Sequence, residues 1–178
     1  LALPSWRQRL ARLAGRDDLD PQQCERLCVL AALHDLGKFG LGFQAKGRAD
    51  LGVAPRGHVD EALSALLLDR ELRQLLQPLL AFGPAVSGLL DASICHHGQP
   101  RAATAVFQQS WWSPRAGLSP RDGVAKLLAL TRRWFPLAFE AGDALPDLPE
   151  FEHGFAGLVM LADWVGSTVS FFPFAENA

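Results

Sequence analysis

The sequence predicts an all-α fold, built as a single compact helical domain. Leucine dominates the apolar residues, isoleucine occurs only at Ile94 and tyrosine is absent. This composition favours helices, because β-branched and aromatic residues are the usual strand formers. Apolar residues also recur at helical spacing through most of the chain. A chain of 178 residues can bury one hydrophobic core but would crowd two, so we expect one domain over residues 1–178.

Two helices are expected in the N-terminal part of the chain. Residues 4–14 carry apolar side chains at helical spacing and are followed by a glycine, which ends helices. Asp20 can cap a second helix over residues 21–36, whose first position is a proline. The dipeptide His34-Asp35 falls in the last turn of this second helix.

The middle of the chain combines an irregular loop with further helices. Residues 39–57 contain five glycines and a proline without a regular period, which predicts a loop. A helix begins at His58 and keeps the helical period to residue 80, with Pro78 as a break or kink. The next helical segment, residues 84–97, ends in two adjacent histidines.

Two helices joined by a loop are expected in the C-terminal part. Residues 121–135 form a helix that stops before Pro136. Residues 140–150 are rich in proline and acidic side chains and predict a loop. The last helix, residues 151–167, is apolar at helical spacing with Asp163 embedded in it. In the first of these helices the residues expected to face the core are Val124, Leu127, Leu128 and Leu130.

The charge of the chain is small overall but uneven along it. A net charge of −2 gives no general attraction to nucleic acid, so DNA binding would need a local patch. Residues 101–134 hold six basic residues and one acidic residue, whereas residues 140–163 hold six acidic residues and no Lys or Arg. This pattern predicts either a polarised surface or a pair of solvated loops.

The cysteines and the hydropathy indicate the compartment. Cys24, Cys28 and Cys95 form an odd and scattered set, which argues against a disulfide framework and for a reducing compartment. We expect Cys24 and Cys28 to pack in the core rather than to bind a metal. No uninterrupted apolar stretch approaches the ~20 residues of a membrane span. Cytoplasmic localisation without a membrane is therefore expected, and the apolar start at Leu1 favours native residues upstream.

Histidines and carboxylates carry the chemical signal. Four of the five histidines fall at the ends of expected helices, and Asp163 is a carboxylate within an apolar helix. Burying such a group without a partner costs several kcal/mol, and a cation would remove this cost. Imidazoles and carboxylates without thiolates suit a catalytic site for Mn, Fe, Co, Ni or Zn rather than a closed structural zinc site. Neighbours on a helix diverge by roughly 100°, so His34 and Asp35 could flank one ion, or Asp35 could bridge two.

A set of short motifs resembles a known family. They are, in chain order, Leu33-His34-Asp35-Leu36-Gly37-Lys38, then Phe43-Gln44, then His58 followed by Glu61, then His96-His97 before Gly98, and finally Leu161-Ala162-Asp163-Trp164-Val165-Gly166-Ser167 ahead of Phe171-Phe172-Pro173-Phe174. This order resembles the HD nuclease domain of the CRISPR type I helicase-nuclease, within the HD superfamily of metal-dependent phosphohydrolases. The resemblance spans about Cys24 to Phe174.

The resemblance implies an all-helical domain that nicks and degrades single-stranded DNA with two divalent ions, for which Mg is possible besides the transition metals. It places His34, Asp35 and Asp163 on one ion. It places His58, His96 and His97 on the other, with Asp35 bridging. The family normally supplies a further histidine from its first helix, and no histidine precedes His34 here. Either that residue lies upstream of Leu1 or the first ion site is weakened.

Several other residues are candidates for substrate contact. Lys38, near the end of its helix, could neutralise charge on the phosphate or merely complement the helix C-terminus. Trp111 and Trp112 could clamp a single strand by stacking, or they could pack in the domain or against a helicase. The basic residues close to them are Arg101 and Arg115. His153 lies about three helical turns before Asp163, which is too far to share its ion.

The expected function is therefore that of a metal-dependent DNA nuclease, with Asp35 and Lys38 as catalytic residues. Its expected partners are single-stranded DNA and a helicase domain or subunit of the CRISPR type I machinery. A second interpretation is an HD phosphohydrolase acting on nucleotides or cyclic nucleotides, which a closed pocket would favour. A third is a catalytically weakened HD module that serves in docking.

Overall fold

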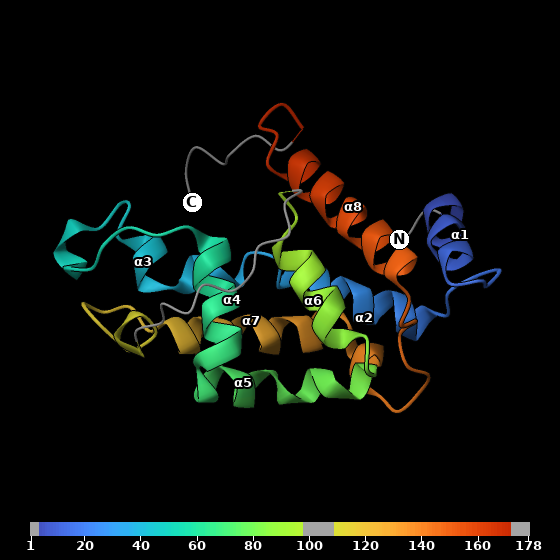
Figure 1. The fold of residues 1–178 in the computed structure, drawn as a ribbon, viewed down its shortest axis with the longest axis horizontal. Coiled ribbons are helices and arrows are strands. Elements are labelled where there is room, and N and C mark those ends of the chain that lie inside the picture. Colours follow the sequence, from blue (N-terminus) through green and yellow to red (C-terminus); the bar gives the residue numbers. More distant parts are fainter. Residues whose placement is uncertain (1–3, 98–108, 172–178) are drawn as a thin grey trace.

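The structure, a computed structural model, describes residues 4–97 and 109–171 and is all-α over these residues. Figure 1 shows the arrangement of the helices. The α-helices are α1 Pro4–Leu13, α2 Pro21–Ala32, α3 Leu41–Gln44, α4 His58–Leu68, α5 Arg70–Leu76, α6 Val86–Ile94, α7 Pro120–Trp134 and α8 Pro149–Gly166. Short 3-10 helices join them: η1 Leu36–Phe39, η2 Ala49–Leu51, η3 Gln77–Phe82, η4 Gln109–Trp111 and η5 Pro136–Phe139.

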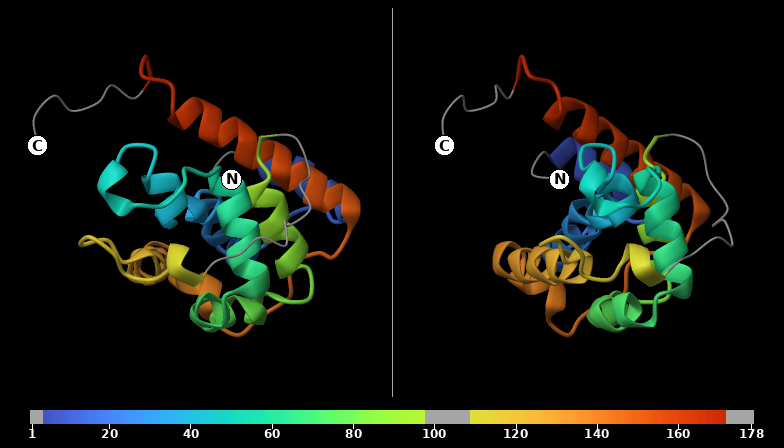
Figure 2. Two further views of the ribbon diagram at one scale, coloured as in Figure 1. Left: turned by 60° about the vertical axis from the view of Figure 1, so that its left-hand side comes forward. Right: turned by 90° about the vertical axis from the view of Figure 1, so that its left-hand side faces the viewer.

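The helix α2 runs through the centre of the hydrophobic core. Its residues Leu27, Val29 and Leu30 are fully buried, and α2 packs against α6 on one side and η5 on another. α8 crosses over α6 and also contacts α1, whereas α7 packs against α5 and η1 (Figures 1 and 2). This packing brings the end of α2, the start of α4, the end of α6 and the C-terminal half of α8 toward one another.

Local sequence explains where α2 begins and ends. Asp20 accepts a hydrogen bond from the Gln23 backbone N–H, and the Gln23 side chain accepts one from the Asp20 N–H, which makes a capping box before Pro21. The helix ends at Ala32, with Leu33 as its C-cap. The predicted start is confirmed, but the predicted end is wrong by about one turn. His34 and Asp35 therefore lie just beyond the helix.

The region from residue 58 to 82 is divided differently from the prediction. One helix with a break at Pro78 was expected, but α4 already ends at Leu68, because Asp69 adopts an extended backbone and caps α5 through the Leu72 N–H. Asp69 is also held by Arg121 of α7, whose Nη2 donates to it at 2.7 Å. The break expected at Pro78 is present as the 3-10 helix η3.

The predicted loop over residues 39–57 contains structure of its own. It includes α3 and η2, which bury a small separate cluster made by Leu41, Ala45 and Leu51. In α7 the side chain of Leu130, expected to face the core, is exposed, and Thr131 is buried instead. The predicted helices 4–14, 84–97, 121–135 and 151–167 are otherwise present, with ends shifted by at most three residues.

In the part of the chain that the structure describes, no single helix has both the length and the apolar composition of a membrane span. The two segments Arg70–Phe82 and Val86–Ile94 reach that threshold only when taken together, and they are bent by 119° at their junction.

Candidate metal centre

The centre is built around the turn that follows α2. Because His34 and Asp35 have left the helix, the divergence expected for adjacent helical residues does not apply to them. His34 Nε2 lies 3.1 Å from Asp35 Oδ2, so the two side chains point to the same place. The turn continues into η1, where Lys38 makes an ion pair with Asp35.

The first residue of α4, His58, faces the other oxygen of the Asp35 carboxylate. Its Nε2 lies 3.5 Å from Asp35 Oδ1. The short distance between η1 and α4 depends on Gly37, since a Cβ atom there would lie 1.8 Å from the His58 carbonyl oxygen. Glycine at this position allows the two backbones to approach closely enough for the two side chains to meet.

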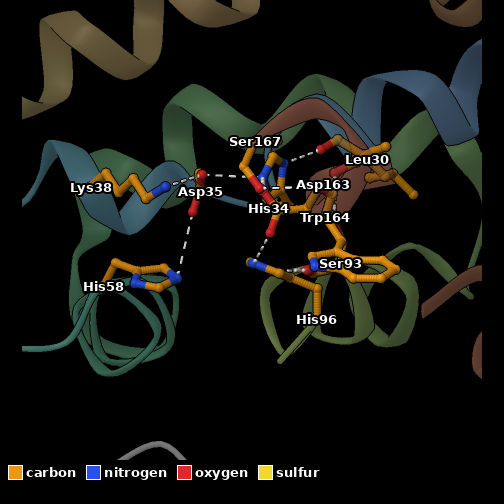
Figure 3. A network of polar contacts seen from close by, with 11 residues as sticks. Leu30, His34, Asp35, Lys38, His58, Ser93, His96, Asp163, Trp164 and Ser167 are labelled. Carbon is orange, nitrogen blue, oxygen red and sulfur yellow. Dashed lines mark hydrogen bonds and ion pairs between the residues drawn. The ribbon is translucent and has the colours of Figure 1, made fainter. Parts of the chain in front are cut away.

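The end of α6 and the C-terminal half of α8 complete the centre, as Figure 3 shows. His96 is buried, and its ring lies 4.2 Å from that of His97 and 4.8 Å from that of His34. Asp163 reaches in from α8, with Oδ1 at 3.4 Å from His34 Nε2 and Oδ2 at 3.6 Å from His96 Nε2. Side chains from four separate segments thus converge, as the sequence predicts.

Backbone carbonyls orient two of the imidazoles. His34 Nδ1 lies 2.7 Å from the Ala31 carbonyl oxygen, and His96 Nδ1 lies 3.0 Å from that of Ser93. A carbonyl oxygen can only accept, so each Nδ1 carries the hydrogen. In the neutral ring this leaves the lone pair on Nε2, which faces the centre in both residues. Such an outer hydrogen bond is the usual support of a histidine that ligates a metal.

The donor atoms of this centre fit a divalent ion. Three of its buried polar atoms, His34 Nε2, Asp35 Oδ1 and His58 Nε2, have no hydrogen-bond partner among the described residues, and such atoms are rare without a reason. Two groups in the described chain have donor atoms within 4.8 Å of one another: His58, His96 and His97, and His34, Asp35 and His96. Imidazole and carboxylate donors at these distances suit borderline divalent metals. His96 belongs to both groups.

The two imidazoles that flank Asp35 have different acidities. Burial lowers the pKa of His58 to about 4, because the nearby Asp35 carboxylate does not compensate for it and Lys38, His97 and His96 oppose the positive charge. Burial also acts on His34, but contacts with Asp35 and the Ala31 carbonyl outweigh it, so its pKa is raised. The pKa of Asp35 is lowered, since His34 and Lys38 outweigh the effect of burial.

A comparison of the chain with models of protein families agrees with this geometry. The family model described as "Cas3, HD domain" matches residues 1–172. The chain belongs to the Cas3 HD domain family. The resemblance to the HD nuclease domain of the CRISPR type I helicase-nuclease is thereby confirmed, and the Cas3 HD family is one of metal-dependent nucleases associated with CRISPR. No curated protein and no solved structure matches the chain at a significant level.

The tryptophans of this Cas3 HD domain do not form the expected stacking clamp. Trp112 is fully buried, Trp111 is 7% exposed, and both belong to the main core. The guanidinium of Arg56 lies 4.0 Å from the centre of the Trp111 ring. Neither ring offers an open face to a nucleic-acid base, so the expectation of a clamp is corrected in favour of core packing.

The remaining candidate residues lie apart from the centre. Arg115 is exposed and donates to the Leu51 carbonyl oxygen at 2.8 Å, which ties its turn to η2. His153 is exposed on α8, with Nδ1 2.8 Å from the Pro149 carbonyl oxygen. Arg101 lies outside the described residues. Cys24 packs against the core as predicted, and so does Cys95, whereas Cys28 is half-buried; all three cysteines are free thiols.

Two residues near the centre were not singled out individually from the sequence. The Phe43 ring meets the His58 ring edge to face at 5.7 Å, and Glu61 is 1% exposed one turn after His58. Both belong to the motifs that carry the resemblance, but neither was given a role. The sequence does contain a signal for Glu61. Like Asp163, it is a carboxylate within an apolar helix, and burying such a group without a partner is costly.

Proposed function

We propose that this Cas3 HD domain is a metal-dependent nuclease that cleaves single-stranded DNA in CRISPR type I interference, supplied with its substrate by a helicase. One observation carries this proposal: within the part of the chain that the structure describes, buried nitrogen and oxygen atoms of His34, Asp35 and His58 face a common centre without hydrogen-bond partners. A divalent ion would give all three a partner. The family membership supplies the reaction class.

The proposed ligands fall into two halves. His34, Asp35 and Asp163 would hold one ion, and His58, His96 and His97 would hold the other, with Asp35 between them. When bound, such ions lower the pKa of a coordinated water and stabilise negative charge on a phosphate. The protein side chains orient these donors in advance, because the Nδ1 hydrogen bonds of His34 and His96 fix the ring positions.

Lys38 is the proposed phosphate contact. Its side chain is 46% exposed while its ammonium group pairs with Asp35, so it reaches from solvent to the edge of the centre. If a bound ion neutralises Asp35, the ammonium group becomes available to a second anion. A phosphate oxygen that gains charge in the transition state is the anion best placed to receive it.

The shape beside the centre supports a polymer substrate. A cavity of about 430 Å³ lies between the turn after α2 and the C-terminal half of α8, and its lining includes His34, Asp35, Lys38 and Asp163. Among the described residues, the rest of that lining is small or aliphatic, from Ala31, Val159, Ala162, Gly166 and Ser167, and it includes no aromatic ring to hold a base. A site that recognises phosphodiester backbone rather than a free nucleotide fits these walls better.

The proposal is tested with circular single-stranded DNA, double-stranded DNA and a panel of nucleotides and cyclic nucleotides, each with Mn, Co, Ni, Zn or Mg. We expect cleavage of the circular single strand by the natural sequence. His34→Ala and Asp35→Ala should abolish cleavage while keeping the helical circular-dichroism spectrum. His153→Ala is the matched control, because it removes a histidine outside the centre, and it should cleave normally.

Other outcomes would reject the proposal in distinct ways. Hydrolysis of nucleotides without cleavage of DNA would identify the chain as a nucleotide phosphohydrolase. Absence of cleavage with every ion would favour a module that serves in docking. Full activity in His34→Ala or Asp35→Ala would show that the reaction takes place elsewhere.

A further inference from the structure

Glu61 is a buried charged group that the metal centre itself does not use. It lies on α4 one turn after His58 and is 1% exposed. An ionised carboxylate is costly to bury unless it has partners. Yet Glu61 is not in either group of described residues whose donor atoms converge on a possible ion site. A role other than ligation therefore has to explain its position.

One oxygen of the Glu61 carboxylate, Oε2, has a buried hydrogen-bond partner, whereas Oε1 has none that the described residues supply. Trp112 Nε1 donates to Glu61 Oε2 at 3.1 Å, and Trp112 is fully buried, so this hydrogen bond lies inside the protein. Burial raises the pKa of Glu61, whereas the charge of Arg56, the Trp112 N–H and the Gly42 backbone N–H favour the ionised form. The group is thus held in place by three different segments.

Two glycines leave room for this carboxylate. A Cβ atom at Gly40 would lie 2.4 Å from Glu61 Oε2, and one at Gly42 would lie 2.0 Å from Oε1. Gly40 has an ordinary φ of −58°, so the backbone conformation does not require glycine there. The close approach of the carboxylate does, which makes residues 40–42 a cradle for Glu61.

The segment that forms this cradle leads directly to the metal centre. Phe43 follows it and meets the His58 ring at 5.7 Å with an interplanar angle of 86°. Gln44 Nε2 donates to the Lys38 carbonyl oxygen at 2.6 Å. Glu61 therefore joins the first turn of α4, which carries His58, to the segment that continues from Asp35 and Lys38.

We propose that Glu61, held by Trp112, is a positioning residue that sets the place of His58 relative to Asp35. This inference rests on the proposed function of the centre and adds to it a residue that touches neither ion nor substrate. It also gives the buried Trp112 a role in place of base stacking. Both side chains act through the backbone of α4 and of residues 40–44.

The test compares cobalt binding by the full chain and by Trp112→Phe. This substitution keeps a buried aromatic ring but removes the hydrogen-bond donor to Glu61. We expect an apparent affinity for Co²⁺, followed by visible absorption, that is roughly tenfold weaker, as is usual when an outer support of a ligand is lost. The NMR signals of the His58 ring should shift in the metal-free variant, while those of His153 on α8 should not.

A second pair of variants and a control separate positioning from general stability. Glu61→Gln keeps an oxygen that can accept from Trp112, so it should bind Co²⁺ more tightly than Glu61→Ala. Phe82→Leu alters a fully buried ring that packs against Arg26, away from the centre. Phe82→Leu serves as the stability control. If it lowers the free energy of unfolding as much as Trp112→Phe does, it should still bind Co²⁺ as tightly as the natural sequence.

Unchanged Co²⁺ affinity in Trp112→Phe, or an equal loss in Phe82→Leu, would overturn the positioning role and leave the proposed function intact. Failure of the natural sequence itself to bind Co²⁺ would instead overturn the proposed function. The two failures are therefore distinguishable in one series of titrations.

Discussion

At the scale of single residues, the centre holds two histidines on either side of one carboxylate with opposite shifts in pKa. His58 is shifted down to about 4 and His34 is shifted up. The difference follows from their contacts, since His34 has the Ala31 carbonyl and two carboxylates beside it, whereas His58 faces one carboxylate and three cationic or imidazole groups. A proton taken up by the metal-free centre therefore goes to His34 before His58.

We expect the two rings to titrate separately in protein stripped of metal with a chelator. An ordinary histidine titrates at about 6.5, so the His58 ring signals should change well below that pH and those of His34 above it, as followed by NMR. His58 is less easily protonated in the folded state, so its contribution to stability is complete above pH 6.5 and is lost as the pH falls toward 4. The raised pKa of His34 acts in the opposite direction, because its contribution to stability is complete below pH 6.5 and is lost as the pH rises above that value. A His58 titration at or above 6.5 would contradict this environment.

The sequence indicates which imidazoles and carboxylates come together but assigns neighbouring side chains poorly. His34, Asp35, His58 and His96 converge as their motif order predicts. Trp111 and Trp112 were wrong as a stacking pair, because composition cannot tell an exposed aromatic residue from a buried one. Their replacement by alanine would mainly unfold the region, so weaker DNA binding in such a variant would not report a clamp.

At the scale of the elements, the ends of helices and the anchors between them decide the geometry. His34 and Asp35 can share a centre because α2 ends at Ala32. The start of α2 could be predicted from Asp20 and Pro21. Its end could not, because Leu33 continues the apolar pattern, and the termination depends on packing of η1 against α4. The cap at Asp69 was missed although its partner, the Leu72 N–H, is local, because apolar residues keep the helical period across it; only the support from Arg121 is distant in sequence.

Arg26 provides a direct test of how α2 is held. It is fully buried, and its guanidinium donates to the backbone carbonyls of Ala138, Glu140 and Asp143. Arg26→Leu would leave these carbonyls without their donor at a cost of about 1–3 kcal/mol for each one that stays buried. We expect a loss of about 3 kcal/mol in the free energy of unfolding, measured with urea.

A matched control for Arg26 lies on α1. Arg7 pairs with Asp18 at the surface, where ion pairs contribute little, so Arg7→Leu should change stability much less. Similar urea midpoints for Arg26→Leu and the natural sequence would show that residues 138–143 are not anchored through this guanidinium.

At the scale of the whole molecule, the centre joins segments that are far apart in the sequence. The turn after α2, the start of α4, the turn after α6 and α8 each contribute a ligand candidate (Figure 3). The all-α class and the convergence of these segments could be predicted from composition and motif order. The packing of α8 across α6, which brings Asp163 to His96, depends on contacts between distant helices and could not be read from local patterns.

Because four segments meet there, an ion should stabilise the entire fold. A ligand present at 100 times its Kd raises the free energy of unfolding by about 2.7 kcal/mol when it binds only the folded chain. We expect Co²⁺ or Mn²⁺ to raise the thermal midpoint, and a chelator to reverse this. Asp35→Asn should abolish the increase, since Asp35 lies between both halves. An equal increase in Asp35→Asn would place the stabilising ion elsewhere.

Crystals grown with Co²⁺ and recorded at the cobalt absorption edge test the metal centre most directly. The anomalous difference map should show density enclosed by His34 Nε2, Asp35, His58 Nε2 and His96 Nε2, with one peak or two according to occupancy. Absence of any anomalous peak among these atoms, at Co²⁺ concentrations that saturate the protein in solution, would contradict the proposed metal centre.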